Sequence, residues 1–327
     1  MNAASVCAVT VIEAHGGAVL AKRWHVGGAC TPYGNAYHVT LHPESVADLT
    51  ALHVLLRRLL SAPRCCIVRA EPIDPARVRW VRRLLHPCPE TGEAPTLREV
   101  PRRWVAVDLD GLPSPAGFDS CDLAACAKLA RAALPHAFRD AAGIVQATAG
   151  HGIKPGARLR WWAWLSRPVT GAELDGWFTG CLVDDSTFRP VQPIFTAAPL
   201  FDAGVADPVP ERLALVPGAR EVVPVPAPAL LRPVRVEPRR SVVPDAGQGG
   251  AGAIAYARRT IAAAPVNARH ATAKRMAAFL AHLHRDGEVK AGDVAEAVAA
   301  GIEAAGKGRA EGEAIARWTL AQIGGAA

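Results

Sequence analysis

The sequence predicts a mixed α/β domain, an extended proline-rich connector and a small all-α domain at the C-terminus. In the first 205 residues, short apolar runs typical of strands alternate with stretches of helical period. Residues 208–244 are dense in proline and valine, and a glycine-rich stretch follows at 248–252. From residue 253 the chain is rich in alanine and follows the helical period. We therefore expect a first domain at 1–205, a linker or wrapping arm at 206–252, and helices at 253–327.

The elements of the first domain follow from local patterns. Apolar residues at helical spacing predict a helix over 45–60 with Ser45 as its cap, and a second over 123–134. A third is expected over 173–181, where Thr170 and Glu173 have the spacing of a capping box. Strands are expected at 65–69, 102–111, 143–148 and 157–165. Residues 77–83 form a basic patch that contains Trp80.

Composition excludes several classes of protein. Half of the 327 residues are hydrophobic, so wholesale disorder is excluded, and the net charge of +7 is compatible with a polyanionic partner. No apolar run approaches the ~18 residues of a membrane helix, and residues 1–20 lack a basic leader, so we expect a cytoplasmic protein without membrane contact. A zinc site at His86, Cys88, Cys121 and Cys126 is disfavoured, because the spacing is irregular and no Cys-x-x-Cys pair exists.

Two carboxylates share one face of the strand at 102–111. Side chains alternate along a strand, so Asp108 and Asp110 point to one side while Val107 and Leu109 point into the core. Two such charges about 4 Å apart repel by ~4 kcal/mol at an effective dielectric of 20, and a divalent cation relieves this. A third carboxylate is expected from Asp184 or Asp185, of which we prefer Asp184. The alternative is an Asp-rich turn that caps the residues after it.

Basic side chains lie between these acids in the sequence. Arg158 and Arg160 share a face of the strand expected at 157–165, as an anionic nucleotide tail requires. His151 lies in a turn whose glycines would let backbone amides approach a phosphate. We regard either a phosphate contact or plain loop polarity as open for His151.

These elements together resemble the archaeo-eukaryotic primase superfamily, in the primase–polymerase form of phages and plasmids. Val107-Asp108-Leu109-Asp110 is similar to its apolar-Asp-apolar-Asp motif, and Val183-Asp184 to its apolar-Asp motif. The small-x-His motif is matched imperfectly: Thr148-Ala-Gly-His151 has one extra position, and on a second alignment Arg160 stands where relatives often hold His.

The resemblance implies a catalytic core with an RRM-like antiparallel sheet that performs template-directed nucleotidyl transfer. Asp108, Asp110 and Asp184 would hold two Mg²⁺ or Mn²⁺ ions, and His151, Arg158 and Arg160 would bind the nucleotide. It also implies a C-terminal helical module in which Arg269, His270 and Thr272, at a helix N-terminus, hold DNA or the initiating nucleotide. The implied partners are a single-stranded DNA template, NTPs or dNTPs, and a separate replicative helicase.

Two other classes of protein stay open. His282-Leu-His284 and Tyr256 mimic a HUH-type replication initiator or relaxase nuclease, but the surrounding residues predict a helix, on which the two imidazoles diverge by ~200°. The other class is a non-catalytic replication protein that binds DNA through its basic surface. Residues 301–308 have the spacing of a P-loop but lack its Ser/Thr and follow a helical stretch, so we expect a helix end there.

Overall fold

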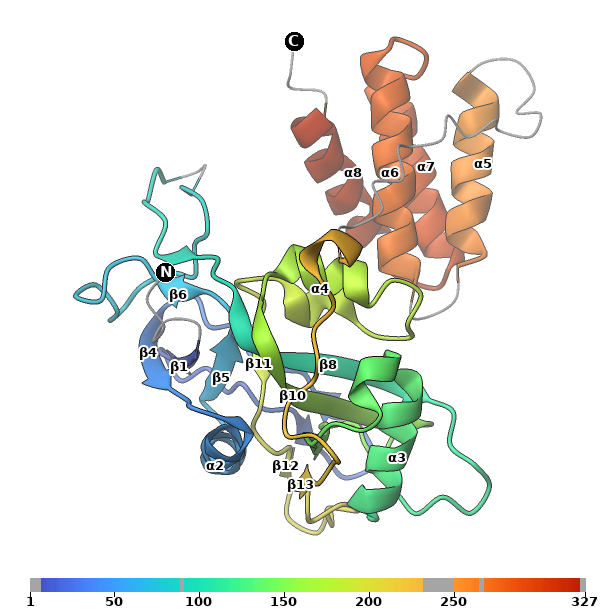
Figure 1. Ribbon diagram of the computed structural model, residues 1–327. Coiled ribbons are helices and arrows are strands. Elements are labelled where there is room, and N and C mark those ends of the chain that lie inside the picture. The colour runs from blue at the N-terminus through green and yellow to red at the C-terminus, as the bar shows by residue number, and fades with distance from the viewer. Residues whose placement is uncertain (1–6, 89–90, 232–249, 265–267, 324–327) are drawn as a thin grey trace. The chain divides into compact units, whose positions relative to one another are not determined.

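The computed structural model describes residues 7–88, 91–231, 250–264 and 268–323. The chain divides into two compact units, Met1–Arg235 and Val236–Ala327. Figure 1 follows the chain from the blue strands of the first unit to the orange and red helices of the second. Each unit is described by itself.

An antiparallel sheet of order β11-β5-β1-β4 opens the first unit. Its strands are β1 (Ala8–Ala14), β4 (Val39–Ser45), β5 (Cys65–Val68) and β11 (Ile194–Phe195). Helix α2 (Leu49–Leu60) follows β4 and buries five leucines on one side. The expectation that Ser45 caps this helix is wrong, because Ser45 pairs with Ala8 as the last residue of β4. Asp48 is the cap, and its carboxylate accepts a hydrogen bond from the Ala51 amide at 2.8 Å.

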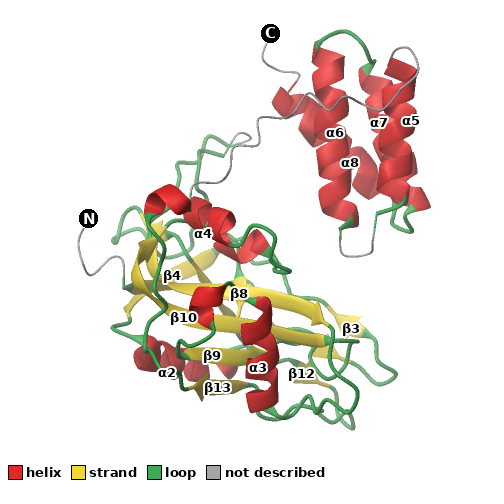
Figure 2. Ribbon diagram, turned by 45° about the vertical axis from the view of Figure 1, so that its right-hand side comes forward, coloured by secondary structure: helices red, strands yellow, loops and turns green. Residues whose placement is uncertain are grey.

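A second antiparallel sheet, of order β13-β9-β10-β8, carries the acidic motif. Its strands are β8 (Arg102–Leu112), β9 (Gly143–Ala147), β10 (Ala157–Val169) and β13 (Leu213–Val216). The strands expected from the alternation of apolar residues are thus confirmed, as is the helix at 123–134, which is α3 (Leu123–Ala133). Figure 2 shows α3 lying across the β9–β10 face of this sheet.

The two faces of the second sheet contribute to two different cores. Val107, Leu109 and Trp161 face α3 and are almost completely buried. Trp104 and Trp162 face the other way and pack with the leucines of α2 and the first sheet. The Trp162 ring is fully buried, and its Nε1 donates to Gln146 Oε1 at 3.0 Å. Because side chains alternate along β8, Asp108 and Asp110 lie on the same face as Trp104, near the end of that strand.

The segment after residue 205 belongs largely to the first unit. Strand β13 pairs with β9 along four residues, from Leu213 opposite Gln146 to Val216 opposite Gly143. Arg212 is buried and donates to the Thr148 carbonyl at 3.0 Å. The segment from residue 206 to the 3₁₀ turn η3 (Pro228–Leu230) therefore packs on the first unit and is not a free linker. We call this segment the arm. Residues 232–249 of the expected connector lie outside the described residues.

Smaller elements complete the first unit. They are β2 (Arg23–Trp24), β3 (Cys30–Thr31), β6 (Glu71–Pro72), β7 (Leu97–Arg98), η1 (His136–Phe138), α4 (Gly171–Trp177), η2 (Asp185–Phe188) and β12 (Leu200–Phe201). The capping box of α4 is present: Thr170 accepts from the Glu173 amide, and the Glu173 carboxylate accepts from the Thr170 amide. The helix ends at Trp177, before the expected Cys181.

The second unit consists of α5 (Gly250–Ala262), α6 (Arg269–Arg285), α7 (Ala291–Ala304) and α8 (Arg309–Ile323) around a core of its own. Gly287 and Gly306 follow helix ends with positive φ, as expected of helix breaks. Gly292 lies within the first turn of α7, and Pro265 is outside the described residues. Among the described residues, none of the helices has the length and apolarity needed to cross a membrane.

Candidate functional site

Asp108 and Asp110 lie on one face of β8, directly opposite two arginines of β10. The strand register pairs Asp108 with Arg160 and Asp110 with Arg158. The exposed side-chain fraction rises along the strand from 22% at Asp108 to 65% at Asp110. The two carboxylates therefore mark the point where the buried face of the sheet opens to solvent.

Asp184 joins this pair through the backbone. Its amide donates to the Asp108 carbonyl at 2.9 Å, which makes an isolated antiparallel bridge between the two residues. Three residues on, the Thr187 hydroxyl donates to the Ala106 carbonyl at 2.9 Å. These bonds fix the 3₁₀ turn η2 along β8, so a carboxylate 76 positions further along the chain reaches the acidic strand.

The choice between Asp184 and Asp185 follows from where each side chain lies. Asp184 lines a cavity together with Asp108 and Asp110, and Asp185 does not. The Asp185 carboxylate is mostly exposed and lies 3.6 Å from the Arg189 guanidinium. The turn interpretation also holds in part, because Asp184 Oδ1 accepts from the Ser186 amide at 2.9 Å.

This cavity, which we call the aspartate cavity, has a volume of 220 Å³. Its walls come from β8, β10, η2 and the segments beside β2, β3 and β11. The lining residues are Lys22, Tyr33, Asp108, Leu109, Asp110, Thr148, Leu159, Arg160, Asp184, Ser186, Thr187, Gln192, Pro193 and Phe195.

Both β10 arginines form ion pairs with the β8 aspartates. Arg160 donates from Nε and Nη2 to the two oxygens of Asp108, the latter at 2.8 Å, and from Nη1 to the Phe195 carbonyl. Burial opposes the guanidinium charge, but Asp108 outweighs it, so the pKa of Arg160 lies above its ordinary value. Arg158 pairs with Asp110. Each carboxylate of the strand is thus neutralised by its cross-strand neighbour.

The donor set of the aspartate cavity suits a hard divalent cation, since three carboxylates from two segments face one hollow. Their present positions do not assemble it: among the described residues, no three His, Cys, Asp or Glu side chains are gathered closely enough to hold a metal ion. Arg160 and Arg158 occupy the oxygens that such an ion would take. The three carboxylates of Asp108, Asp110 and Asp184 are therefore suitable ligands for such an ion, but the two guanidinium groups must move away before it can bind.

His151 is not brought to the cavity wall. The ring is 1% exposed; Nε2 donates to the Ser120 carbonyl at 3.0 Å, and Nδ1 accepts from the Arg158 amide at 3.0 Å. Burial, aided by the charge of Arg212, lowers the pKa of His151, so the neutral ring is favoured. With both nitrogens engaged, this residue shapes the turn that holds Arg158, and Arg160 is the basic group of the two that lines the cavity.

Sequence reasoning missed several residues of the cavity. Lys22 precedes β2, and Tyr33 follows β3. The Tyr33 ring stacks on Phe195 with centroids 3.8 Å apart and planes inclined by 3°. Burial, together with Asp108, raises the pKa of Tyr33 to about 12, so its phenol stays neutral. No motif marked these residues, because short strands distant in sequence bring them to the site.

Further positive charges lie near Lys22, which lines the cavity. Burial and the charges of Lys154 and Arg158 lower the pKa of Lys22, whereas Asp110 acts in the opposite direction. Gly150 allows this crowding, because a Cβ there would lie 3.1 Å from Arg158 Cδ and 3.6 Å from Lys154 Cδ. Among the described side chains, neither lysine has an acidic partner within salt-bridge distance. Both cations are therefore available to an anionic ligand.

The helical unit carries the remaining predicted residues. Arg269 begins α6, and His270 and Thr272 follow within its first turn, as expected. Thr272 is buried, while His270 Nδ1 lies 2.8 Å from Glu311 Oε1. His282 and His284 lie on the same helix, and His284 Nδ1 donates to the Val289 carbonyl at 2.8 Å. A strand-borne His pair of the relaxase kind is therefore absent from these two positions.

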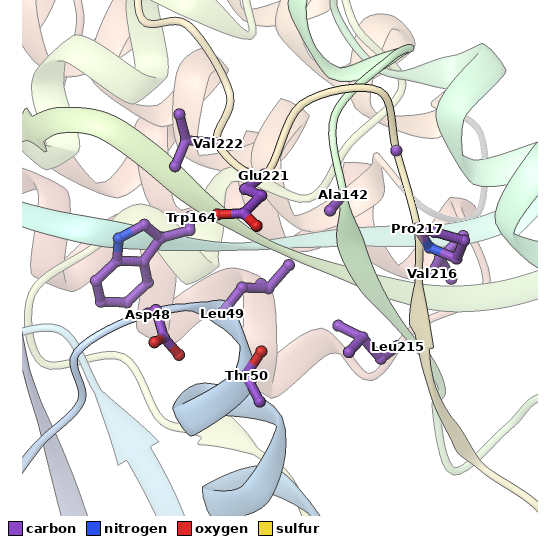
Figure 3. Close-up of a pocket in the computed structure, with 11 residues that line it drawn as sticks. Asp48, Leu49, Thr50, Ala142, Trp164, Leu215, Val216, Pro217, Glu221 and Val222 are labelled. Atoms are coloured by element: carbon purple, nitrogen blue, oxygen red, sulfur yellow. The ribbon is translucent and has the colours of Figure 1, made fainter.

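Another cavity, of 450 Å³, lies beside the first turn of α2 and contains none of the predicted site residues. Figure 3 shows Trp164 of β10 and Glu221 of the arm on its walls, with Asp48 and Thr50 of the α2 end below them. Because residues of the arm line this cavity together with residues of α2 and β10, the arm is part of the first unit.

Comparisons with known proteins add no relative to this geometry. A scan against protein-family models, a search of curated proteins and a search of solved structures each find no match for the chain.

Proposed function

We propose that the first unit is the catalytic domain of a DNA primase–polymerase of a phage- or plasmid-type mobile element, and that it joins nucleotides on a single-stranded DNA template. The observation that carries the proposal is the backbone bridge from Asp184 to Asp108, which supports a third carboxylate beside the acidic strand. A surplus of cations beside three acids is the arrangement that a nucleoside triphosphate and its metal ions need.

The roles follow from position. Asp108, Asp110 and Asp184 would hold Mg²⁺ or Mn²⁺, which when bound supplies charge neutralisation and activation of the attacking hydroxyl. Arg158 and Arg160 would neutralise the triphosphate, joined by Lys22 of the cavity wall and by Lys154, whose charge acts on Lys22. The Tyr33–Phe195 stack offers an apolar wall for the nucleoside. The helical unit, through Arg269 and His270, would hold DNA or the initiating nucleotide, and a separate helicase would open the duplex.

The decisive experiment compares two neighbouring carboxylates. The full chain is incubated with single-stranded template, labelled NTPs or dNTPs and Mn²⁺, and the products are sized on a gel. We expect Asp184→Asn to lower primer synthesis about 100-fold or more, since a lost metal ligand removes several kcal/mol of transition-state stabilisation. Asp185→Asn, adjacent and exposed, should keep activity within about twofold.

Three results would overturn the proposal. Equal activity of both variants would remove Asp184 from the metal site. Absence of synthesis by the unaltered protein, with DNA binding that persists in chelator and falls steeply with salt, would favour the non-catalytic DNA-binding protein. Nicking of a supercoiled origin through a Tyr256 adduct would favour the relaxase instead.

A further inference from the structure

Trp80, in the basic segment 77–83, has a backbone that ordinary side chains avoid. Its φ of 53° makes it the one non-glycine residue with positive φ among those that the structure describes. The indole is nevertheless 60% exposed. The left-handed conformation costs roughly 1–2 kcal/mol in an L-residue, and such strain persists only where the surroundings enforce it. A bulky apolar ring held outward in this way calls for a reason beyond packing.

The enforcement comes from pairing with the edge strand β4. Val39 and Val81 exchange both backbone hydrogen bonds at 2.9 Å, and the Leu41 amide donates to the Val78 carbonyl at 2.8 Å. One residue of β4 thus faces two residues of the other segment, Arg79 and Trp80, as in a β-bulge. The extra residue is displaced from the ladder, and Trp80 is turned over the end of the strand pair.

The displaced indole completes a row of rings. It stacks on His38 with centroids 5.0 Å apart and planes inclined by 14°, and it lies 4.8 Å from the His15 ring. His15 and His38 are cross-strand neighbours, since the His15 amide donates to the His38 carbonyl at 3.1 Å. Tyr37, 59% exposed, continues the row 4.9 Å beyond His38. We call His15, Trp80, His38 and Tyr37 the aromatic row.

Arginines surround the aromatic row. The Arg82 guanidinium lies 4.6 Å from the centre of the Tyr37 ring and 3.3 Å from the Glu93 carboxylate. Arg77 and Arg79 are exposed, and neither has a salt bridge to any described side chain. The surface therefore offers two exposed aromatic side chains, Trp80 and Tyr37, together with two cations that have no salt-bridge partner among the described residues.

We infer that the aromatic row and Arg77, Arg79 and Arg82 form a binding surface for single-stranded nucleic acid. Unpaired bases stack on aromatic faces whatever their identity, while arginines follow the phosphates. A duplex keeps its bases stacked on one another and would leave Trp80 without a partner. The inference goes beyond the proposed catalysis and does not depend on it, since binding of a strand needs neither a metal ion nor a nucleotide.

The test measures the affinity of the full chain for a fluorescently labelled oligodeoxythymidine of about 20 nucleotides, by fluorescence anisotropy in the presence of EDTA. We expect Trp80→Ala to weaken binding by about 5- to 100-fold, the range for one lost stacking contact. Trp80→Phe should keep most of the affinity, because it retains an aromatic face. The assay contains EDTA and no nucleoside triphosphate, which separates binding at this surface from the catalytic proposal.

Matched controls address exposure and charge. Trp318→Ala removes an indole that is 59% exposed, about as much as that of Trp80, and that has the Lys274 ammonium over its ring. We expect it to bind within about twofold of the unaltered protein. Arg77→Ala with Arg79→Ala should lower the salt slope of log K by about 1.4, at roughly 0.7 per phosphate contact in a single strand. Arg57→Ala with Arg139→Ala, two exposed arginines elsewhere, should leave the slope unchanged.

The inference is overturned if folded Trp80→Ala, checked by circular dichroism, binds the oligonucleotide as the unaltered protein does. Equal losses in Trp80→Ala and Trp318→Ala would also overturn it, since any exposed indole would then serve. A third contrary result is equal weakening of single-stranded and duplex binding by Trp80→Ala, because stacking requires unpaired bases.

Discussion

The pairing of Asp108 with Arg160 is the residue-scale feature on which the chemistry of the cavity turns. Arg160 engages both oxygens of the carboxylate and is itself almost completely buried. A metal ion and this guanidinium therefore compete for the same oxygens. The two partners need each other while the cavity holds no other cation, because an unpaired charge in a partly buried position is costly.

Replacement of Arg160 by Gln tests this competition. We expect Arg160→Gln to lower the free energy of unfolding by about 2–3 kcal/mol without divalent cations, somewhat below the range for a fully buried pair. Mn²⁺ should then raise the melting temperature of the variant more than that of the unaltered protein, since Asp108 is free to bind it. Thermal scans with and without Mn²⁺ measure both effects. An equal Mn²⁺ shift in the two proteins would contradict the competition.

Strain at Trp80 gives a second prediction at this scale. Trp80→Gly and Trp80→Ala both remove the indole, but glycine adopts a φ of 53° without strain. Trp80→Gly should therefore be more stable than Trp80→Ala by about 1 kcal/mol. Urea unfolding of the two variants, side by side, measures the difference. A less stable glycine variant would mean that the backbone relaxes once the ring is gone.

Residue patterns predicted the acidic face of β8 well and the rest of the cavity less well. Alternation alone gave Asp108 and Asp110 a common side, because a strand has a fixed period of two. The sequence left Asp184 and Asp185 both open, with a preference for Asp184. The contact that brings Asp184 to the strand is its backbone bridge to Asp108, which no local pattern encodes. Lys22 and Tyr33 were missed because two-residue strands leave almost no periodic signal.

At the scale of elements, the turn before β10 is held by its histidine. His151 bridges the Ser120 carbonyl and the Arg158 amide, and burial lowers its pKa. The unfolded chain, with an ordinary histidine pKa of about 6.5, binds the proton more readily than the folded one. The stabilisation by neutral His151 is thus fully present above about pH 6.5 and is lost as the pH falls toward the depressed folded value.

The variant His151→Gln should reduce this pH dependence. The unaltered protein is expected to lose unfolding free energy between pH 7.5 and 5.5, and His151→Gln to lose less over the same interval. The midpoints of urea unfolding at both pH values measure the change. His53, whose pKa burial also lowers, serves as the comparison: His53→Gln tests whether the effect belongs to the turn. Parallel pH profiles for His151→Gln and the unaltered protein would exclude the assignment.

The bounds of helices and strands were predicted best where a long periodic pattern of apolar residues was followed by a residue that ends the element. Helix α3 and strands β8 and β9 lie within a few residues of their expected bounds. The segment after residue 205 was harder, because its prolines suggest a linker while its valines and leucines fit a strand. Pairing with β9 decides between them, and that is a tertiary contact that composition does not contain.

For the whole molecule, the arm decides where the first unit ends. A fragment of residues 1–205 would lack β13 and Arg212, so β9 would become an unpaired edge and the Thr148 carbonyl would lose a buried donor. A fragment of residues 1–235 keeps both. We expect the longer fragment to unfold in one cooperative transition at the temperature of the corresponding transition in the full chain, and the shorter one to aggregate or to melt at least about 5 °C lower. Calorimetry of the three proteins, with circular dichroism to confirm folding, measures this. If residues 1–205 melt like residues 1–235, the arm is an accessory to the fold, and the composition boundary at 205 is the true end of the domain.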